Sequence, residues 1–240
     1  MPRTRPGADI RDGTDPPGDG GSSDAMRPAP DRPLAGAPGR GRATPPSADA
    51  RLLAIATEHL RRLGHRQVTV VGVAAEAGMT HANVYRYFPS KVALVDAVAG
   101  RWLREVEAEL AVIADAPDPA DDKLERLLLA LAALQRDALL HDPNLFAVHL
   151  DATVESRPIA RRHRGRLRVL VERVIEEGLN AGAFSLRDRE RALAFIFDAS
   201  HRFLHPASIQ LDAEIPRDLI DLRLGAVIRV LLRALRTGVL

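Results

Sequence analysis

Apolar residues recur at helical spacing along most of the chain, and no segment alternates apolar and polar residues as a half-buried strand does. From Ser47 to Leu63 the apolar positions fall three and four residues apart, and Gly64 ends the run. The sequence therefore predicts an all-α protein. The expected helices span residues 47–63, 70–77, about 81–88, 91–113, 122–140, 143–154, 158–181, 188–205 and 216–236.

Short polar residues and glycines mark the ends of the early helices. Thr69 can cap the helix that begins at Val70, and Gly78 stops it. Thr80 can cap the next helix, which is short because Pro89 disfavours helical dihedral angles in the residue before it. Two helices joined by a glycine turn form a helix-turn-helix, here at about residues 69–88, whose second helix can lie in the major groove of DNA.

The first 46 residues differ in composition from the rest of the chain. They are rich in Pro, Gly, Asp and Arg and have no hydrophobic period, so they cannot bury enough apolar surface to offset the entropy of ordering. We expect a disordered tail at 1–46, a helix-turn-helix domain at 47–106 and a larger helical domain at 107–240. The tail has two interpretations. It is a solvated segment without function or the result of a mis-assigned start codon, or else it is an arm whose Arg40 and Arg42 contact DNA.

Composition narrows the chemistry of the chain. It contains no cysteine, which removes disulfides, thiolate catalysis and cysteine-based zinc sites. The glycine-rich nucleotide loops, the nucleophile elbow and the HExxH metal motif are absent, so an enzyme is a minor alternative. The net charge of +2 is too small to indicate nucleic-acid binding by itself. No apolar run approaches the roughly 18 residues of a membrane span, and we expect a cytoplasmic protein without a membrane partner.

The stretch AGMTHANVYRYFPSK (77–91) concentrates residues suited to contact nucleic acid. Val84 and Phe88 are expected to face the interior of the small bundle. Tyr85, Tyr87 and Lys91 are then expected to contact phosphate oxygens, with packing inside the bundle as the alternative for the tyrosines. The residues left facing outward have side chains suited to base edges and phosphates, and they are Thr80, His81, Ala82, Asn83 and Arg86.

The run VTVVGVAAEAGMTHANVYRYFPSKVALVDAV (68–98), preceded by RRLG (61–64), resembles the DNA-binding domain of the tetracycline-repressor (TetR/AcrR) family of bacterial regulators. This resemblance implies an all-α homodimer, a repressor whose larger C-terminal domain binds a small-molecule effector and releases palindromic operator DNA. His81 stands where the family commonly has lysine, and Ala82 where it commonly has glycine. The resemblance implies DNA contacts at Thr69, Thr80, His81, Asn83, Tyr85, Tyr87 and Lys91.

The last two predicted helices are the most apolar segments of the chain. They predict a buried core, and the resemblance adds a four-helix interface with a second protomer; both can hold at once. The expected interface residues are Leu224, Val227, Ile228, Leu231, Leu232 and Leu235. Helix position suggests Trp102, Phe146, His149 and Phe195 as ligand-binding residues, with core packing as the alternative for each.

Two polar patterns in the larger domain have competing interpretations. His201 and His205 are four residues apart with Asp198 on the same face, which is metal-ligand spacing; the alternative is a histidine pair at a helix end stopped by Pro206. We expect no metal and no cofactor. The run RPIARRHRGRLR (157–168) holds six arginines and no acid, and predicts a solvated helix face or, as the alternative, an accessory surface for DNA or an acidic partner.

The leading hypothesis is a ligand-responsive transcriptional regulator. The first alternative is a structural DNA-binding protein without an effector, which would need less helix than residues 114–240 provide. The second is an enzyme. Effector, operator and regulated genes are not encoded in any pattern of the sequence.

Overall fold

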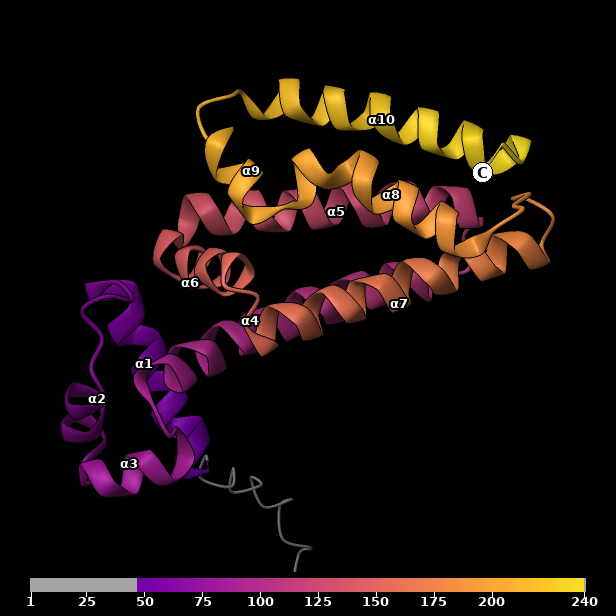
Figure 1. The fold of residues 1–240 in the computed structure, drawn as a ribbon. Helices are drawn as coiled ribbons and strands as arrows, with labels where there is room; N and C mark the ends of the chain where they lie inside the picture. The colour runs from indigo at the N-terminus through magenta and orange to yellow at the C-terminus, as the bar shows by residue number, and fades with distance from the viewer. Residues whose placement is uncertain (1–46, 240) are drawn as a thin grey trace, which may run out of the picture. The chain divides into compact units, whose positions relative to one another are not determined.

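The computed structural model describes residues 47–239, and all regular secondary structure in that range is helical. The all-α prediction is confirmed, and each predicted helix begins and ends within two residues of an observed one. The predictions for residues 1–46, including Arg40 and Arg42, lie outside the described residues. The helices are α1 (Ala48–Leu63), α2 (Val70–Ala77), α3 (His81–Tyr87), α4 (Lys91–Ala114), α5 (Ala120–His141), α6 (Pro143–Val154), α7 (Pro158–Asn180), α8 (Arg189–Leu204), α9 (Pro206–Leu211) and α10 (Arg217–Thr237) (Figure 1).

The helix-turn-helix is built by α2 and α3 around a glycine turn. Gly78 has a φ of 66°, in the left-handed region that glycine adopts without strain. This conformation lets the N–H groups of Gly78 and Met79 donate to the carbonyl of Ala74 near the end of α2. The two helices pack on α1 through a small apolar core that includes Leu52, Ala56, Leu60, Val68, Val73, Ala74 and Val84.

One helix, α4, belongs to two hydrophobic cores. Its first half, with Leu94 and Val98, packs against α1 and the helix-turn-helix, whereas its second half, with Val106 and Leu110, packs against α5 and α7. The predicted domain boundary at residue 106 falls inside this uninterrupted helix, and residues 45–240 form one compact unit. The 24 residues of α4 span about 36 Å, so the helix connects two distant parts of that unit.

The larger bundle is organised around α5, which contacts every helix from α4 to α10. Figure 1 shows α8 and α10 on one side of α5, running in opposite directions, and α4 beside α7 on the other. Leu124, Leu127 and Leu131 of α5 are buried between these layers. The long amphipathic patterns of the sequence therefore meet in one apolar core.

A buried lysine fixes the C-terminal end of α4. The ammonium group of Lys123 in α5 donates to the carbonyl oxygens of Ala114 and Ala116 at 3.2 and 3.1 Å. It also donates to a carboxylate oxygen of Glu177 in α7 at 2.5 Å. The last carbonyls of a helix lack intrahelical partners and attract positive charge, so Lys123 stabilises this end and joins three helices.

One helix, α9, was not predicted, because Pro206 was read only as the stop of the preceding helix. Proline does end α8, but at the first position of a helix its missing N–H costs nothing and its fixed φ is already helical. His205 is accordingly both the residue that ends α8 and the one that precedes α9. Ile209 of α9 is buried against Phe146 and Ala138.

The most apolar positions of α10 face the interior of the chain itself. Five of the six predicted interface residues are 5% exposed or less, and Val227 is half-buried. These side chains are core residues of a single chain, as the first of the two interpretations predicted, and their contact with a second protomer stays a prediction. The buried residues are Leu224, Ile228, Leu231, Leu232 and Leu235. The outward side of α10 instead carries Leu222, Ala226 and Val230, four residues apart and all exposed.

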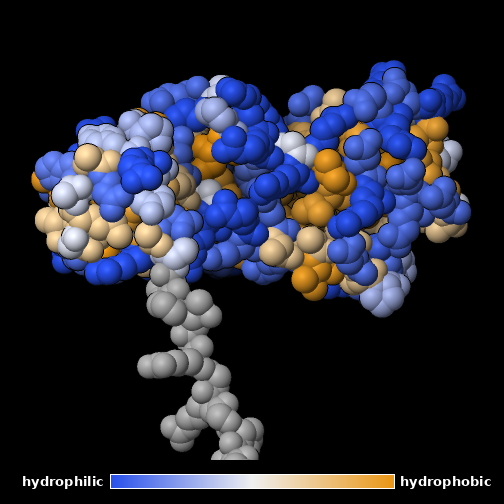
Figure 2. Space-filling model, turned by 90° about the horizontal axis from the view of Figure 1, so that it is seen from below, coloured by the Kyte–Doolittle hydropathy of each residue, from blue (hydrophilic) through white to orange (hydrophobic). Residues whose placement is uncertain are grey.

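The surface reflects the amphipathic patterns of the helices. Seen from below, it is mainly hydrophilic, and the apolar side chains appear as separate patches (Figure 2). Exposed apolar residues such as Val112 of α4 and Val169 of α7 contribute to the apolar surface. Within residues 47–239, no helix is both long and apolar enough to cross a membrane.

Two glycines of α7 give a matched test of the packing. A Cβ added at Gly178 would lie 2.2 Å from the ring of buried Phe184, whereas one added at Gly165 meets no atom within 4 Å. Gly165→Ala should raise the free energy of unfolding by up to about 1 kcal/mol, because alanine favours the helix. Gly178→Ala should lower it by about 1–3 kcal/mol, because the ring must move. Urea unfolding followed by circular dichroism measures both, and a similar effect at the two positions would contradict the packing.

Candidate functional site

The helix α3 presents an exposed row of polar and aromatic side chains. Its inner side is fixed by Val84 and Phe88, which are buried in the small core. Tyr85 and Tyr87 are 49% and 44% exposed, so the alternative that they only pack the bundle is wrong. The outward direction predicted for the other residues is confirmed for Thr80, His81, Ala82 and Arg86, whereas Asn83 is half-buried.

Two threonines cap the helices of the motif. The hydroxyl oxygen of Thr69 accepts a hydrogen bond from the N–H of Gly72 at 3.0 Å, and that of Thr80 accepts from the N–H of Asn83 at 3.3 Å. Each satisfies a backbone donor in the first turn that has no intrahelical partner. Thr69 and Thr80 therefore fix the start of α2 and α3, in addition to the DNA contacts predicted for them.

Lys91 has a structural partner at the base of the motif. Its ammonium group donates to the carbonyl oxygen of Arg66 at 2.6 Å, joining the first residue of α4 to the loop before α2. The ring Nε2 of buried His59 in α1 lies 2.6 Å from a carboxylate oxygen of Glu76 in α2. These two contacts hold the helix-turn-helix against α1 and α4, and the predicted phosphate contact of Lys91 stays a prediction.

A cavity of about 180 Å³ lies in the larger bundle. Residues from α5, α6, α7 and α8 and from the start of α9 line it. Its polar lining residues include Gln135, His149, His163, Arg164, His201 and His205, and its apolar ones include Leu131, Leu167, Phe197 and Leu204. Four histidines, from α6, from α7 and from the end of α8, thus border one small space.

Of the four predicted ligand-binding residues, only His149 lines this cavity. Phe146 is buried in a separate cluster with Ile209, and Phe195 packs against the main core. Phe197, two positions along α8 from Phe195, borders the cavity instead. Trp102 lies behind His149, with the two ring centroids 5.5 Å apart in an edge-to-face arrangement. Phe146 and Phe195 therefore fit the alternative of core packing, because helix position alone does not tell which side of a helix faces a cavity, and ligand binding by any of the four residues stays a prediction.

Several buried polar atoms around the cavity have no hydrogen-bond partner among the described residues. Gln135 donates its amide N–H to the carbonyl oxygen of Leu204 at 3.0 Å, but its Oε1 is unpaired. An unpaired buried polar group costs about 1–3 kcal/mol, so this concentration of them indicates a binding site. The other unpaired atoms of the lining are both ring nitrogens of His149, Nε2 of His163 and Nδ1 of His205.

His163 is oriented by a carboxylate of α4. Its Nδ1 donates to Glu107 Oε1 at 2.8 Å, and Arg166 donates to Glu107 Oε2 at 2.5 Å. Burial raises the pKa of Glu107, but the hydrogen bonds from His163 and Arg166 outweigh that effect and hold the pKa below its usual value. Because Nδ1 of His163 is engaged by Glu107, the unpaired Nε2 is the nitrogen left for a bound molecule.

His149 is uncharged near neutral pH. Burial is the main cause, and together with the neighbouring His163 and His205 it lowers the pKa of the His149 ring to about 3. The rings of His149 and His163 meet edge to face, with their centroids 5.6 Å apart. A neutral imidazole has one donor and one acceptor nitrogen, so His149 offers a bound molecule one of each.

The metal candidates do not form a ligand set. His201 and His205 stack on each other with ring centroids 4.6 Å apart. Within residues 47–239, no group of three or more His, Asp or Glu side chains is placed to hold a metal ion, so Asp198 does not complete a site with the two histidines. Burial lowers the pKa of His205, and the nearby His201 and Arg164 add to that shift.

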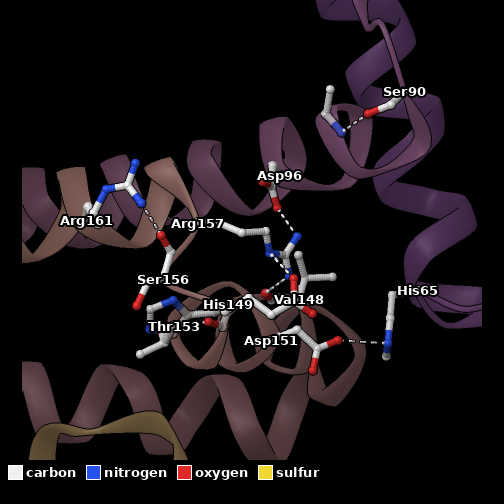
Figure 3. A network of polar contacts seen from close by, with 12 residues as sticks. His65, Ser90, Asp96, Val148, His149, Asp151, Thr153, Ser156, Arg157 and Arg161 are labelled. Atoms are coloured by element: carbon white, nitrogen blue, oxygen red, sulfur yellow. Dashed lines mark hydrogen bonds and ion pairs between the residues drawn. The ribbon is translucent and has the colours of Figure 1, made fainter.

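Direct contacts connect the cavity wall to the helix-turn-helix end. Arg157 donates to Asp96 of α4 at 2.5 Å and to the carbonyl oxygen of Val148 in α6 at 3.4 Å (Figure 3). His65, which follows α1, lies 3.2 Å from Asp151 of α6 (Figure 3). Because α6 also carries His149, these contacts join one wall of the cavity to α4 and to the segment that follows α1.

The arginine run of α7 is only partly a solvated face. Arg157 is largely buried, and three of the six arginines are paired with acids of other helices. These pairs are Arg157 with Asp96, Arg166 with Glu107, and Arg168 with Glu190. Arg162 stays exposed and borders a groove of about 590 Å³ between α4 and α7. That groove is more open to solvent than the cavity, so it encloses a small molecule less well.

Two family models match the chain. The model described as bacterial regulatory proteins, tetR family, matches residues 52–98. The model described as tetracyclin repressor-like, C-terminal domain, matches residues 120–228. Together these matches cover well over half of the chain. A search of curated protein sequences gave no significant match.

Many solved structures are similar to this one. A transcriptional regulator of the TetR/AcrR family from Thermobifida fusca YX-ER1 is 20% identical, over 77% of this chain and 96% of that one, with a TM-score of 0.56. A protein with unknown function from Rhodococcus sp. RHA1 is 22% identical over 82% and 100%, with a TM-score of 0.61. RolR in complex with resorcinol is 22% identical over 76% and 86%, with a TM-score of 0.53. At these identities the similarity shows the shared fold.

Replacing His149 tests whether its ring is held neutral at a cost to stability. The pKa is about 3 in the folded chain against 6.5 for a free histidine, so the unfolded chain binds the proton more tightly. Stability is therefore lost as the pH falls from about 6.5 towards 3, by up to about 1.4 kcal/mol per pH unit. His149→Leu should flatten this loss, and at pH 7 it should raise the free energy of unfolding by about 1 kcal/mol by removing two unpaired nitrogens.

Urea unfolding at several pH values between 4 and 7.5 measures the effect. His141→Leu is the control, because His141 is exposed at the end of α5 and bonds only to the carbonyl of Asp137 in its own helix. An unchanged pH dependence in His149→Leu would show that the ring is solvated.

Proposed function

The chain belongs to the TetR family of bacterial regulatory proteins, and on that premise we propose that it is a ligand-responsive transcriptional repressor. A homodimer binds a palindromic operator and leaves it when a small molecule occupies the cavity. The observation that carries this proposal is the exposed row of polar and aromatic side chains on α3. In a helix-turn-helix, such a second helix enters the major groove and reads base edges.

The side chains of α3 divide into two proposed roles. His81, Asn83 and Arg86 carry groups that donate to or accept from base edges in the major groove. The hydroxyl groups of Tyr85 and Tyr87 are suited to phosphate oxygens, which position the protein without reading sequence. Histidine at position 81 has a shorter reach than lysine, so we propose that this residue contacts a base edge or phosphate close to the start of α3.

The second protomer is proposed to pack on the outward side of α8 and α10. Leu222, Ala226 and Val230 form an exposed apolar row along α10, and α8 lies beside it in the opposite direction (Figure 1). Two such helices from each protomer form a four-helix interface around a twofold axis. This face differs from the interface expected from the sequence, whose residues are buried in the core of the single chain.

Release of DNA is proposed to follow two connected routes from the cavity. In the first, a molecule bound at His163 acts on Glu107 and thereby on α4, whose N-terminal end adjoins α3. In the second, a molecule bound at His149 moves α6, which contacts the end of α1 through Asp142 and Asn144. By linkage, the ligand and the DNA weaken each other's binding by the same factor, which is typically 5- to 150-fold.

The size of the cavity supports an effector of about one ring. The volume of about 180 Å³ is close to that of an engineered cavity of about 150 Å³ that holds benzene. The similar structure of RolR contains resorcinol, a molecule with a single ring. We therefore propose an effector of similar size for this chain.

Base reading and phosphate contact are separable by two substitutions. On an operator found by selection from genomic fragments, Asn83→Ala should cost about 1–3 kcal/mol of specific binding and relax the preference for that sequence. Lys91→Gln keeps a donor for the carbonyl oxygen of Arg66 but removes the charge. It should weaken binding to all sequences alike and lower the slope of log K against log salt by about one. Fluorescence anisotropy at several salt concentrations measures both, and equal loss of specificity in the two variants would contradict the assignment.

The dimer face is tested by Val230→Arg. In a twofold dimer the substitution would bury two symmetry-related arginines in an apolar interface, where each loses its hydration and repels the other. This variant should therefore be monomeric in sedimentation experiments. On DNA it should lose the paired protection of two half-sites about 34 Å, or a multiple of it, apart. The matched control is Val169→Arg on α7, which is similarly exposed but distant in sequence from α10. A dimer that persists in Val230→Arg would place the interface elsewhere.

A further inference from the structure

The cavity has a lining that suits an anion. Four histidines and Arg164 border it, and none of its lining residues is an acid. Within the described part of the chain, no carboxylate lies within ion-pairing distance of Arg164. Glu107, which contacts the lining residue His163, is already paired with His163 and Arg166. A cationic ligand would find no counter-charge here, whereas an anionic one would pair with Arg164.

The unpaired atoms require a ligand that donates as well as accepts hydrogen bonds. Gln135, His149 and His163 are 5% exposed or less, so their unpaired atoms are not ordinary surface groups. Gln135 Oε1 only accepts, and it therefore needs a donor such as a hydroxyl group. Neutral His149 supplies one donor and one acceptor. A carboxylate group alone satisfies the donors of the cavity but leaves the amide oxygen of Gln135 without a partner.

We infer that the effector is a small hydroxylated carboxylic acid of about one ring in size, which binds with its carboxylate towards Arg164 and its hydroxyl towards Gln135. This inference rests on the proposed function of the cavity as the effector site. The apolar part of the lining, Leu131, Leu167, Phe197 and Leu204, covers the ring. Arg164 is exposed at the edge of the cavity, so an uncharged ring would use the same apolar walls but gain no ion pair with it.

Binding of the acid is coupled to proton uptake. The groups that face His149 are Trp102 of α4, His163 of α7 and His205 at the end of α8, with Glu107 and Arg166 beyond His163 and with His201 and Arg164 beside His205. The pKa values of His149 and His205 are lowered by burial, and an anion beside these two rings favours their protonated forms. The acid should therefore bind more tightly as the pH is lowered from 8 to 6, whereas an uncharged analogue should show no such trend.

The probes are 3- and 4-hydroxybenzoate, with three matched compounds: benzoate, hydroxybenzyl alcohol and hydroxybenzylamine. Trp102 is the only tryptophan of the chain and contacts His149, so its fluorescence reports on the cavity without a label. We expect one of the hydroxybenzoates to bind at least about tenfold more tightly than its alcohol at pH 7, and the amine not to bind. Calorimetry in buffers of different ionisation enthalpy measures the proton uptake.

Two substitutions test which residue binds the carboxylate of the ligand and which binds its hydroxyl group. Arg164→Gln should weaken the hydroxybenzoate by about tenfold and leave the alcohol unchanged. Arg162→Gln is its control, because Arg162 is an exposed arginine of the same helix that borders the open groove and not the cavity. Gln135→Leu should remove the advantage of hydroxybenzoate over benzoate.

Measuring operator binding alongside ligand binding distinguishes a failure of this inference from a failure of the proposed function. If the alcohol binds as tightly as the acid, or if no acid changes Trp102 fluorescence at millimolar concentration, the inference is overturned, while specific binding of an operator still supports a regulator. If an acid binds as described but no DNA fragment is retained, the cavity assignment stands and the regulatory role falls.

Discussion

The structure depends on one helix that is buried in two places at once. The N-terminal half of α4 completes the core of the helix-turn-helix, and its C-terminal half completes the core of the larger bundle. Packed interiors have few alternative arrangements, so neither core can shift α4 without disturbing the other. The cap provided by Ser90 at one end and the buried ammonium of Lys123 at the other fix both ends of the helix. A regulator with this construction needs no separate hinge between its two functions.

The cavity is the place where the larger bundle departs from an apolar core. Burying unpaired imidazole and amide groups reduces stability, and leucine or phenylalanine at the same positions would fill the space at no such cost. Polar groups retained at this cost are typical of binding sites. Glu107 gives the cavity a direct connection to α4, because the same carboxylate that orients His163 belongs to the shared helix. The open groove between α4 and α7 is larger but has no comparable set of unpaired atoms.

The helix-turn-helix and the larger bundle are stabilised by different kinds of contact. The helix-turn-helix is held by local capping bonds and a few small side chains, and it leaves its polar and aromatic residues outside. The larger bundle is held by long-range apolar contacts and by ion pairs between helices, such as Arg157 with Asp96. The exposed side chains of α3 can therefore change without disturbing the core, whereas the cavity depends on the packing of at least four helices.

The sequence by itself determined the helices, the glycine turn and the outward residues of α3. These features depend on neighbours within a few positions: Thr69 and Thr80 as caps, Gly78 in its left-handed turn, and the spacing that buries Val84 and Phe88. The short helix after Pro206 was missed because a proline after a long helix is compatible with either a loop or a new helix start.

The tertiary structure decided which residues share a site. Gln135, His149, His163 and His205 lie on four different segments, and nothing in their spacing brings them together. Phe197 borders the cavity and Phe195 does not, although both are aromatic residues of one helix, because the rotation of α8 is set by its neighbours. The same rotation, for α10, directs Leu224 and Ile228 into the chain and Val230 outward. Periodicity shows that a helix has an apolar side, but only the packing of the other helices determines what that side contacts.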